Sequence, residues 1–322
     1  MKVWWQVRWA ARQGPLETKV ADRMRILLTG NSGQVGGALL PILADKHEVI
    51  APSHEAFDLA KPDKLAPALD RFASDLVINP AAYTAVDRAE EEPELAFKVN
   101  AEAPRAIARW AARHKVPLIH FSTDYVFNGQ GDRHLREDSP TGPLSVYGKS
   151  KLAGEDAIRE AAGSHLIVRT SWVYAAQGSN FLRTIARLAR EREELKIVAD
   201  QIGAPTSARV IAEAVAGLIT VGRSDLPVRF ADANGIVNIV TAGETSWHGF
   251  ATSIVEGLRS RSVTLAVKSI LSLRTEEYPT KAKRPNNSRL DLTRLHDVFG
   301  ITMPTWQTAL EPELDEIARE MR

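Results

Sequence analysis

The chain has 322 residues, of which 44% are hydrophobic and 25% are charged; this is ordinary usage for a globular protein of about two domains. Because 41 Lys and Arg stand against 40 Asp and Glu, the charge balance excludes a basic field strong enough to bind nucleic acid. The absence of cysteine excludes disulfides, cysteine metal sites and cysteine nucleophiles. No apolar run approaches the roughly 18 residues of a membrane span, so we expect a cytoplasmic protein with no membrane partner.

The first 23 residues differ in composition from the rest of the chain. They contain Trp4, Trp5 and Trp9 together with five basic and two acidic residues. Arg8 interrupts the apolar segment that a secretory signal would need, and an Arg-rich targeting peptide is the less favoured alternative. Because Met24 directly precedes a strand-like run, we expect residues 1–23 to be a dispensable N-terminal extension.

Short apolar runs alternate with longer helical patterns from residue 24 onward. Strands are predicted at 26–29, 48–51, 75–79, 117–122 and 165–170, and helices at 34–44, 63–72, 87–114 and 147–162. Strands that alternate with helices of about ten or more residues indicate parallel strands joined by crossover helices. The sequence therefore predicts an α/β fold with a doubly wound parallel Rossmann sheet.

The pattern becomes less regular after about residue 175. Helices are predicted at 180–193, 207–221, 246–259 and 305–321, separated by loops. We therefore expect an NAD(P)-binding Rossmann domain over 24–175 and a smaller, mixed substrate-binding region over 176–322. The chain of this second region can cross back into the Rossmann domain, and a cleft is expected between the two.

A glycine loop joins the first predicted strand to the first helix. Gly30, Gly33 and Gly36 recur at every third position, so the backbone can turn tightly and approach a pyrophosphate at the helix N-terminus. A spaced glycine triplet alone is a weak signal, but its place between strand and helix is the context that the motif requires. The loop predicts dinucleotide binding, and its spacing is typical of short-chain dehydrogenases.

A tyrosine and a lysine lie four residues apart at the start of the predicted helix 147–162. Tyr147 and Lys151 would share one helix face. A nearby ammonium would lower the pKa of the phenol from about 10, and the phenol could then donate a proton to a carbonyl oxygen as hydride arrives. The pair also occurs by chance in many helices, but its position after the fourth strand of a dinucleotide fold favours catalysis.

Two hydroxyls, those of Ser122 and Thr123, end the fourth predicted strand. The carboxyl ends of parallel strands line the cofactor crevice, so either hydroxyl could bind a substrate carbonyl and orient the phenol. The alternative is a turn or helix-capping role. Because no helix is predicted for the next twenty residues, we favour the role at the substrate.

From Met24 to the C-terminus the chain resembles the dTDP-4-dehydrorhamnose reductases, a family of extended short-chain dehydrogenases. The matching stretches are 30–36, 79–87, 122–127, 147–151, 169–174, 200–206 and 284–290, and their combination is far more specific than any one of them. The resemblance implies reduction of the 4-keto group of dTDP-4-dehydro-L-rhamnose by NAD(P)H, which yields dTDP-L-rhamnose.

The resemblance also implies roles for individual residues. Tyr147 would donate the proton, Lys151 would adjust its pKa and bind the ribose, and Thr123 would complete the catalytic set. The other residues expected to bind the cofactor are Gly30, Gly33, Gln34, Val35, Gly36, Ser53, Asp58, Leu59, Ala81, Ala82, Tyr83 and Phe121. The residues expected to bind the nucleotide sugar are Thr123, Asp124, Trp172, Arg284 and Arg289.

Three features depart from the family pattern. Pro80 follows Asn79 and removes a backbone donor. Ala38 occupies the position at which some members carry a glutamate for a metal between subunits, and the histidines lack ligand spacing, so we expect no metal. The extension 1–23 has no family counterpart. A monomer or a homodimer is consistent with these features.

The tip of the second predicted strand bears on cofactor choice. Ser53 and His54 can donate to a 2′-phosphate, whereas Glu55 comes one residue too late to bind the ribose. We therefore expect a modest preference for NADPH, with NADH tolerated. Two alternatives to the reductase remain: a related nucleotide-sugar epimerase or dehydratase, and a non-catalytic NADP-binding regulatory subunit of a methionine adenosyltransferase.

Overall fold

A computed structural model describes residues 23–321 of the chain. The predicted N-terminal extension lies, apart from Arg23, outside these residues. In the described part of the chain, no helix is long and apolar enough to cross a membrane.

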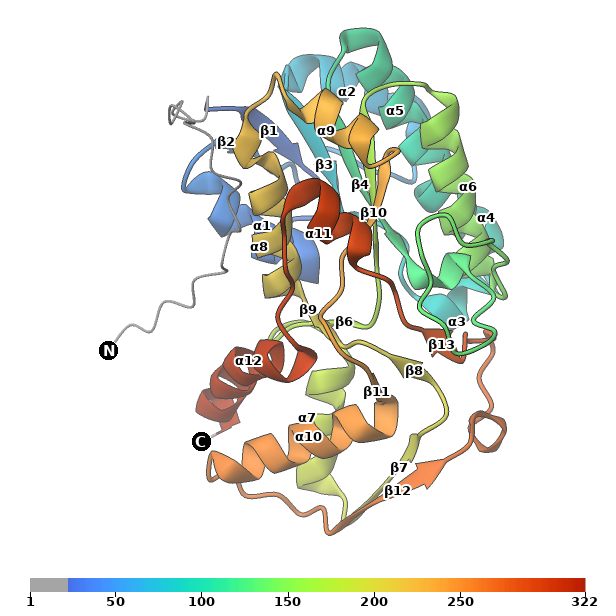
Figure 1. The fold of residues 1–322 in the computed structure, drawn as a ribbon, viewed down its shortest axis with the longest axis vertical. Coiled ribbons are helices and arrows are strands. Elements are labelled where there is room, and N and C mark those ends of the chain that lie inside the picture. Colours follow the sequence, from blue (N-terminus) through green and yellow to red (C-terminus); the bar gives the residue numbers. More distant parts are fainter. Residues whose placement is uncertain (1–22, 322) are drawn as a thin grey trace.

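A six-stranded parallel sheet forms the centre of the molecule (Figure 1). Its strands, in order across the sheet, are β2 (Glu48–Ile50), β1 (Arg25–Leu28), β3 (Leu76–Asn79), β4 (Leu118–Thr123), β5 (His165–Thr170) and β10 (Ile236–Asn238). The chain moves from β1 to one side to form β2 and to the other side to form β3, so the order reverses between β1 and β3. Ligands of doubly wound sheets bind at this switch point. The predicted Rossmann-like fold is confirmed.

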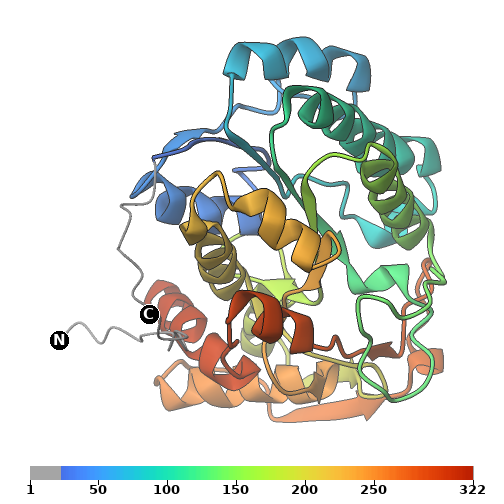
Figure 2. The ribbon, with the colours of Figure 1, turned by 45° about the horizontal axis from the view of Figure 1, so that its top comes forward.

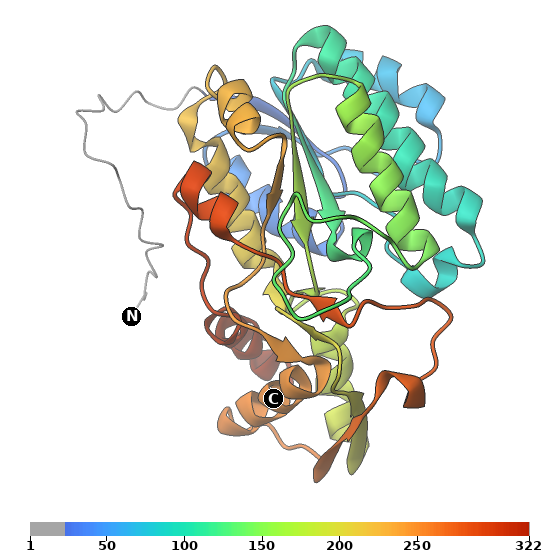
Figure 3. The same ribbon diagram turned by 45° about the vertical axis from the view of Figure 1, so that its right-hand side comes forward.

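Helices cover both faces of this sheet (Figure 2; Figure 3). Ile26 and Leu28 of β1 pack in one core with α1 (Gln34–Ala44) and α8 (Ala208–Leu218), whereas Leu27 packs in the other. That second core includes residues of α2 (Leu65–Phe72), α5 (Ala103–His114) and α6 (Val146–Glu160). Because side chains alternate along a strand and both faces are buried, β1 is apolar from Ile26 to Leu28.

The single helix predicted over 87–114 is wrong, because the structure has four shorter elements there. These are α3 (Val86–Ala89), α4 (Pro93–Phe97), the π-helical turn η2 (Lys98–Glu102) and α5. Pro93 begins α4, because proline fits the first helical position. Pro104 has no N–H for the bond to the carbonyl of Asn100 that a continuous α-helix would require, and the π-helical turn lies directly before it.

A second apolar cluster lies at the end of the molecule opposite the sheet, in the lower half of Figure 1. It involves α7 (Phe181–Glu191), α10 (Trp247–Ser260), α12 (Trp306–Met321) and the parallel pair β7 (Glu194–Val198) and β12 (Ser269–Leu273). The sheet nevertheless takes β10 from this half of the chain, and α8 covers it. The domain boundary near residue 175 stays a prediction.

Short elements complete the fold. Two small sheets consist of β11 (Thr245–Ser246), β8 (Ile202–Gly203) and β13 (Asn287–Ser288), and of β6 (Val173–Tyr174) and β9 (Thr206–Ser207). The remaining helices are α9 (Leu226–Asp232) and α11 (Thr293–Phe299), and the 3₁₀ turns are η1 (Pro62–Lys64), η3 (Asp124–Val126), η4 (Ile219–Val221) and η5 (Thr275–Glu277).

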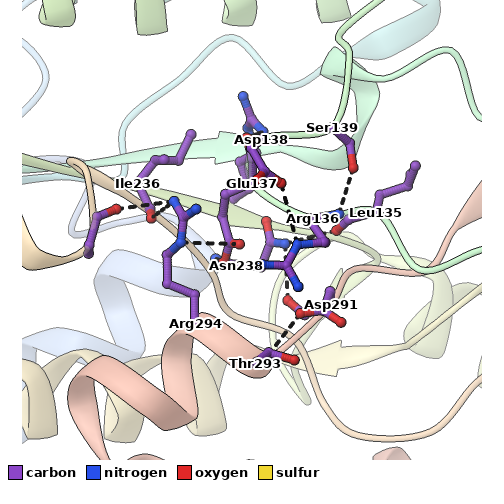
Figure 4. A network of polar contacts seen from close by, with 12 residues as sticks. Leu135, Arg136, Glu137, Asp138, Ser139, Ile236, Asn238, Asp291, Thr293 and Arg294 are labelled. Carbon is purple, nitrogen blue, oxygen red and sulfur yellow. Dashed lines mark hydrogen bonds and ion pairs between the residues drawn. The ribbon is translucent and has the colours of Figure 1, made fainter.

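A buried polar network ties the long loop after β4 to the C-terminal part of the chain (Figure 4). Glu137 accepts the N–H of Asn238 at 2.9 Å and lies 3.5 Å from Arg294. The amide of Asn238 donates to the carbonyls of Leu135 and Asp291, at 3.0 and 3.1 Å. Since a buried charge is stable only when it is paired and hydrogen-bonded, this network fixes the loop. The loop in turn holds the segment 284–291 beside the end of β4.

Candidate active site

The glycine loop brings the ends of β1 and β3 together at the switch point. Gly30 has a φ of +58°, and a Cβ there would lie 2.9 Å from the Cα of Ala81. A Cβ on Gly36 would lie 2.1 Å from the carbonyl oxygen of Gly30. Helix α1 begins at Gln34, and the preceding Gly33 supplies no side-chain cap. The backbone N–H groups of the first turn are therefore available to an anion, which is what a pyrophosphate requires.

A cavity of about 390 Å³ opens at this point, a volume suited to a small ligand. The residues predicted to bind the cofactor that line it are Gly30, Ser53, Asp58, Leu59, Ala81, Ala82 and Tyr83. Gly33 and Gln34 line a neighbouring groove instead, while Val35 is half-buried and packs against the core. His54 is among the described residues that line the cavity, and Glu55 is not.

The rim of this cavity is fixed by local hydrogen bonds. Strand β2 ends at Ile50, and the hydroxyl of Ser53 accepts the N–H of Ala56 at 3.3 Å. Asp58 accepts the N–H of Ala60 at 2.9 Å and pairs with Lys61 at 2.8 Å. The hydrogen bond from Lys61 lowers the pKa of Asp58, so this carboxylate stays ionised and its charge is offset.

Strand β4 ends at Thr123, and the 3₁₀ turn η3 follows at once. The hydroxyl of Thr123 accepts the N–H of Tyr125 at 3.2 Å and donates to Asp124 Oδ1 at 3.0 Å. The expectation that no helical element follows was therefore wrong, since a single turn is too short to show a helical period. Thr123 both caps this turn and lies near Tyr147.

Tyr147 lies in the first turn of α6, whose start is fixed by Ser145. The hydroxyl of Ser145 accepts the N–H of Gly148 at 3.2 Å, a typical N-cap. Thr123 lies close enough to the phenol of Tyr147 to lower its pKa, and the ring of Tyr147 meets that of Tyr125 edge-on, with centroids 5.5 Å apart. Burial raises the pKa of Tyr147 to about 12. At neutral pH the phenol keeps its proton and can act as an acid.

Lys151 lies one turn further along α6 and is buried. Its Nζ donates to the carbonyl of Phe121 at 2.6 Å and lies 3.3 Å from His120 Nε2. Burial lowers its pKa to about 8, against the opposing effect of Glu155. The expected lowering of the pKa of Tyr147 by this ammonium does not occur in the protein alone, because burial of the phenol dominates.

Two buried residues of the site were missed at the sequence level. Asn100 in η2 exchanges hydrogen bonds of 2.9 and 3.0 Å with the backbone of Tyr83 and donates to Ser150 at 3.0 Å. It thereby joins the cavity wall to α6. His120 interrupts the apolar run 118–121 of β4, and that interruption was the available signal. A π-helical turn has no comparable signature in the hydrophobic period.

The predicted substrate residues Asp124 and Arg284 are both held by other side chains. Asp124 is buried and accepts the hydroxyl of Ser288 at 2.5 Å, and burial raises its pKa to about 6. Arg284 donates to both oxygens of Asp87, at 3.2 and 2.6 Å. Arg284, Asp124 and Tyr147 all act electrostatically on Tyr125, so the structure brings these residues together.

The other two predicted substrate residues, Trp172 and Arg289, have different surroundings. Arg289 donates to Glu244 at 2.6 Å and to Asn287 at 3.2 Å. Trp172 has a φ of +50°, which is uncommon for a bulky residue. Its ring stacks on Trp247, with centroids 3.6 Å apart and planes within 11°. One face of the Trp172 ring is therefore already covered by protein.

The groove beside α1 contains charged groups but no candidate metal centre. Ala38 lines it together with Arg209 and Glu313, and these two residues pair at 3.0 Å. Within residues 23–321, no group of three potential metal ligands comes together. The carboxylate of Glu313 is thus satisfied by a guanidinium and by the N–H of Ala176, at 2.7 Å.

Comparisons with known proteins agree on one family. The model of the family described as "RmlD substrate binding domain" matches residues 24–319. The dTDP-4-dehydrorhamnose reductase of Escherichia coli K12 is 41% identical over 298 residues, covering 91% of this chain and 98% of that protein. The enzyme of the same name from Burkholderia thailandensis is 45% identical over 290 residues, covering 89% and 97%.

Solved structures lead to the same family. A Bacillus anthracis dTDP-4-dehydrorhamnose reductase, solved in complex with NADP, superposes with a TM-score of 0.82 at 31% identity, covering 91% of this chain and 99% of that one. An orthologue from Clostridium acetobutylicum superposes with a TM-score of 0.80 at 34% identity, covering 90% and 98%. The chain therefore belongs to the dTDP-4-dehydrorhamnose reductase family of oxidoreductases.

Proposed function

We propose that this chain reduces the 4-keto group of dTDP-4-dehydro-L-rhamnose to give dTDP-L-rhamnose, with NADPH as the hydride donor. One observation carries the proposal. The phenol of Tyr147, which its raised pKa keeps protonated, interacts with Thr123 at the carboxyl end of β4, the edge of the sheet on which doubly wound folds bind their ligands. A ketone that receives a hydride needs a proton donor at its oxygen.

Tyr147 is the proton donor in this proposal, and Thr123 is its partner at the substrate oxygen. The Thr123 hydroxyl, which donates to Asp124, can rotate to donate to the substrate carbonyl. Tyr147 then delivers its proton as the alkoxide forms, and the alkoxide is a stronger base than the phenolate left behind. Lys151, one turn further along α6, would stabilise the phenolate as charge develops.

The residues proposed to hold the cofactor lie around the switch point of the sheet. The glycine loop and the first turn of α1 would bind the pyrophosphate, and Lys151 the ribose. The cavity at the switch point would take the adenosine end, with Ser53 on its rim. The bound cofactor supplies the hydride. The NADP complex of the Bacillus anthracis relative supports this assignment, and the absence of Glu55 from the described cavity lining favours NADPH, with NADH tolerated.

Arg284 is the residue that we propose binds the diphosphate of the nucleotide sugar. Its bonds to Asp87 and to the carbonyl of Ala282 use three of its five N–H groups. The remaining two can donate to a phosphate, and a planar guanidinium suits that geometry. Asp124, Trp172 and Arg289 complete the proposed substrate set. A cytoplasmic location and a monomer or homodimer remain predictions of the sequence.

A turnover assay with a panel of substrates tests this function. The purified full-length chain is given NADPH and, in turn, dTDP-, GDP- and UDP-linked 4-keto sugars, and loss of NADPH absorbance is followed. We expect the highest kcat/KM with dTDP-4-dehydro-L-rhamnose. Interconversion of sugars without net NADPH loss would indicate an epimerase instead. NADPH binding without turnover of any sugar would contradict the proposal and favour a regulatory subunit.

A further inference from the structure

A row of buried polar side chains leads from Lys151 across the sheet to Thr29, which lines the cavity. Lys151 Nζ lies 3.3 Å from His120 Nε2, and His120 Nδ1 lies 3.0 Å from the amide of Asn79. The hydroxyl of Thr29 donates to Asn79 Oδ1 at 2.6 Å. All four side chains are buried, with at most 2% of their surface exposed. They come from β4, β3, the end of β1 and α6, so three strands and a helix converge on one ammonium.

A buried ammonium is stable only when acceptors surround it. The carbonyl of Phe121 supplies one acceptor for Lys151, at 2.6 Å. The imidazole of His120 supplies a second if Nε2 carries a lone pair and Nδ1 carries the proton. That proton then needs an acceptor. In the structure Asn79 Nδ2 faces His120 Nδ1, and Asn79 Oδ1 accepts the hydroxyl of Thr29. With the amide turned over, Oδ1 accepts the Nδ1 proton and the NH₂ donates to Thr29, and the two orientations are told apart only by the hydrogen-bond network. The Asn79 amide fits in either orientation because its oxygen and nitrogen ends are of similar size.

We propose that His120 is a positioning residue for Lys151. Its Nε2 lone pair holds the ammonium against the Phe121 carbonyl and leaves the third N–H of Lys151 free for the phenol and the cofactor ribose. With its oxygen turned toward His120, the Asn79 amide accepts the Nδ1 proton and is compatible with the tautomer that makes this possible. The inference rests on the proposed function for its consequence in catalysis, but its structural core concerns the protein alone.

The charges around this pair agree with a neutral ring. Burial and the neighbouring Lys151 both lower the pKa of His120 well below its ordinary value. The groups near Lys151 are His120 on β4, and Tyr147 and Glu155 on α6, of which Glu155 favours the ammonium. Glu155 is itself bound to the buried Arg169 at 2.6 Å. His120 therefore stabilises Lys151 as an acceptor and adds no charge.

Nuclear magnetic resonance of the full-length protein without ligands tests the proposal directly. Long-range proton–nitrogen correlation of labelled histidine reports the tautomer, and the His120→Gln variant identifies the resonance. We expect His120 to be neutral and protonated at Nδ1 at pH values below the pKa of Lys151. A ring protonated at Nε2 under these conditions, or a charged ring, would overturn the proposal.

The second measurement is the titration of Lys151, followed through the chemical shift of its Cε atom. We expect a pKa near 8 in the wild type, and a decrease of about one unit or more in His120→Leu, since one acceptor of a charged hydrogen bond is lost. His120→Gln restores an acceptor and should return the pKa of Lys151 to within about half a unit of the wild-type value. His47→Gln, at another buried histidine remote from α6, is the matched control and should leave it unchanged.

The same variants separate this proposal from the proposed function. The alkaline limb of the pH profile of kcat should move in His120→Leu and recover in His120→Gln, whereas a purely structural change would lower kcat at every pH. An unaltered Lys151 titration in folded His120→Leu refutes the positioning role. If His120→Leu does not fold, the tautomer of His120 in the wild type and the titration of Lys151 in His120→Gln decide whether the positioning role holds. A wild type that shows the expected titration but reduces no sugar refutes the function and leaves the positioning role standing.

Discussion

Replacing Tyr147 by phenylalanine removes the proposed acid and little else. The ring and its edge-on contact with Tyr125 remain, so folding stability should change by no more than about 1 kcal/mol, the size of one hydrogen bond. The catalytic loss is far larger, because general acids typically contribute ~10²–10⁴ in rate. We therefore expect kcat to fall by at least about a hundredfold, the equivalent of ~3 kcal/mol in the barrier, while NADPH affinity changes little.

The assay compares steady-state kcat with NADPH affinity measured by fluorescence titration. Tyr125→Phe is the matched control, since its ring lies beside that of Tyr147 and its hydroxyl is one atom in the same buried environment. This control should retain kcat within a few-fold. If Tyr147→Phe keeps more than about a tenth of the wild-type kcat, or if the control loses as much, the general-acid role is refuted.

Four further predictions follow from the described contacts. Lys151→Met should abolish reduction yet raise the free energy of unfolding at pH 7 by up to about 3 kcal/mol, because folding lowers the pKa of Lys151 from 10.5 to about 8. In urea titrations this gain in stability should shrink as the pH rises from 8 to 10.5. A loss of stability at pH 7 would contradict the prediction. Arg284→Met should raise the KM for the nucleotide sugar by about tenfold or more and leave NADPH affinity unchanged; an unaltered KM removes Arg284 from the substrate site. Chelation by EDTA should leave turnover intact, as Ala38 cannot ligate a cation, and recovery with magnesium after a loss would reveal another ligand set. The kcat/KM with NADPH should exceed that with NADH by a ratio that corresponds to no more than ~1–2 kcal/mol in activation free energy. A hundredfold preference for NADH would place Glu55, not Ser53, at the ribose.

The alternation of strands and helices could be recognised because four of the predicted strands, β1, β3, β4 and β5, are mainly buried on both faces of the sheet. What the sequence concealed has local physical causes. Strand β10 has three residues, too few to show a period. In the pair β7 and β12 only Leu195 and Val198 are buried, so neither strand forms a buried apolar run. The break in the helix predicted over 87–114 follows from Pro93 and Pro104, which periodicity alone does not register.

The candidate site was predictable where function depends on a local motif. The glycine loop and the spacing of Tyr147 and Lys151 belong to single turns of chain, so their geometry is encoded nearby. The partners of these residues come from distant segments. Asp124 accepts hydrogen bonds from both Thr123 and Ser288, and Lys151 on α6 contacts His120 on β4. Such contacts depend on tertiary packing, which no spacing in the sequence expresses.

Transfer of a labelled hydride is the measurement that tests the central claim most directly. The chain is given dTDP-4-dehydro-L-rhamnose and NADPH that carries deuterium at the transferable position, and the sugar product is analysed by nuclear magnetic resonance. The account predicts one deuterium at C4 of dTDP-L-rhamnose for each NADPH oxidised. Oxidation of NADPH without deuterium at C4, or no product with the folded protein, would contradict it.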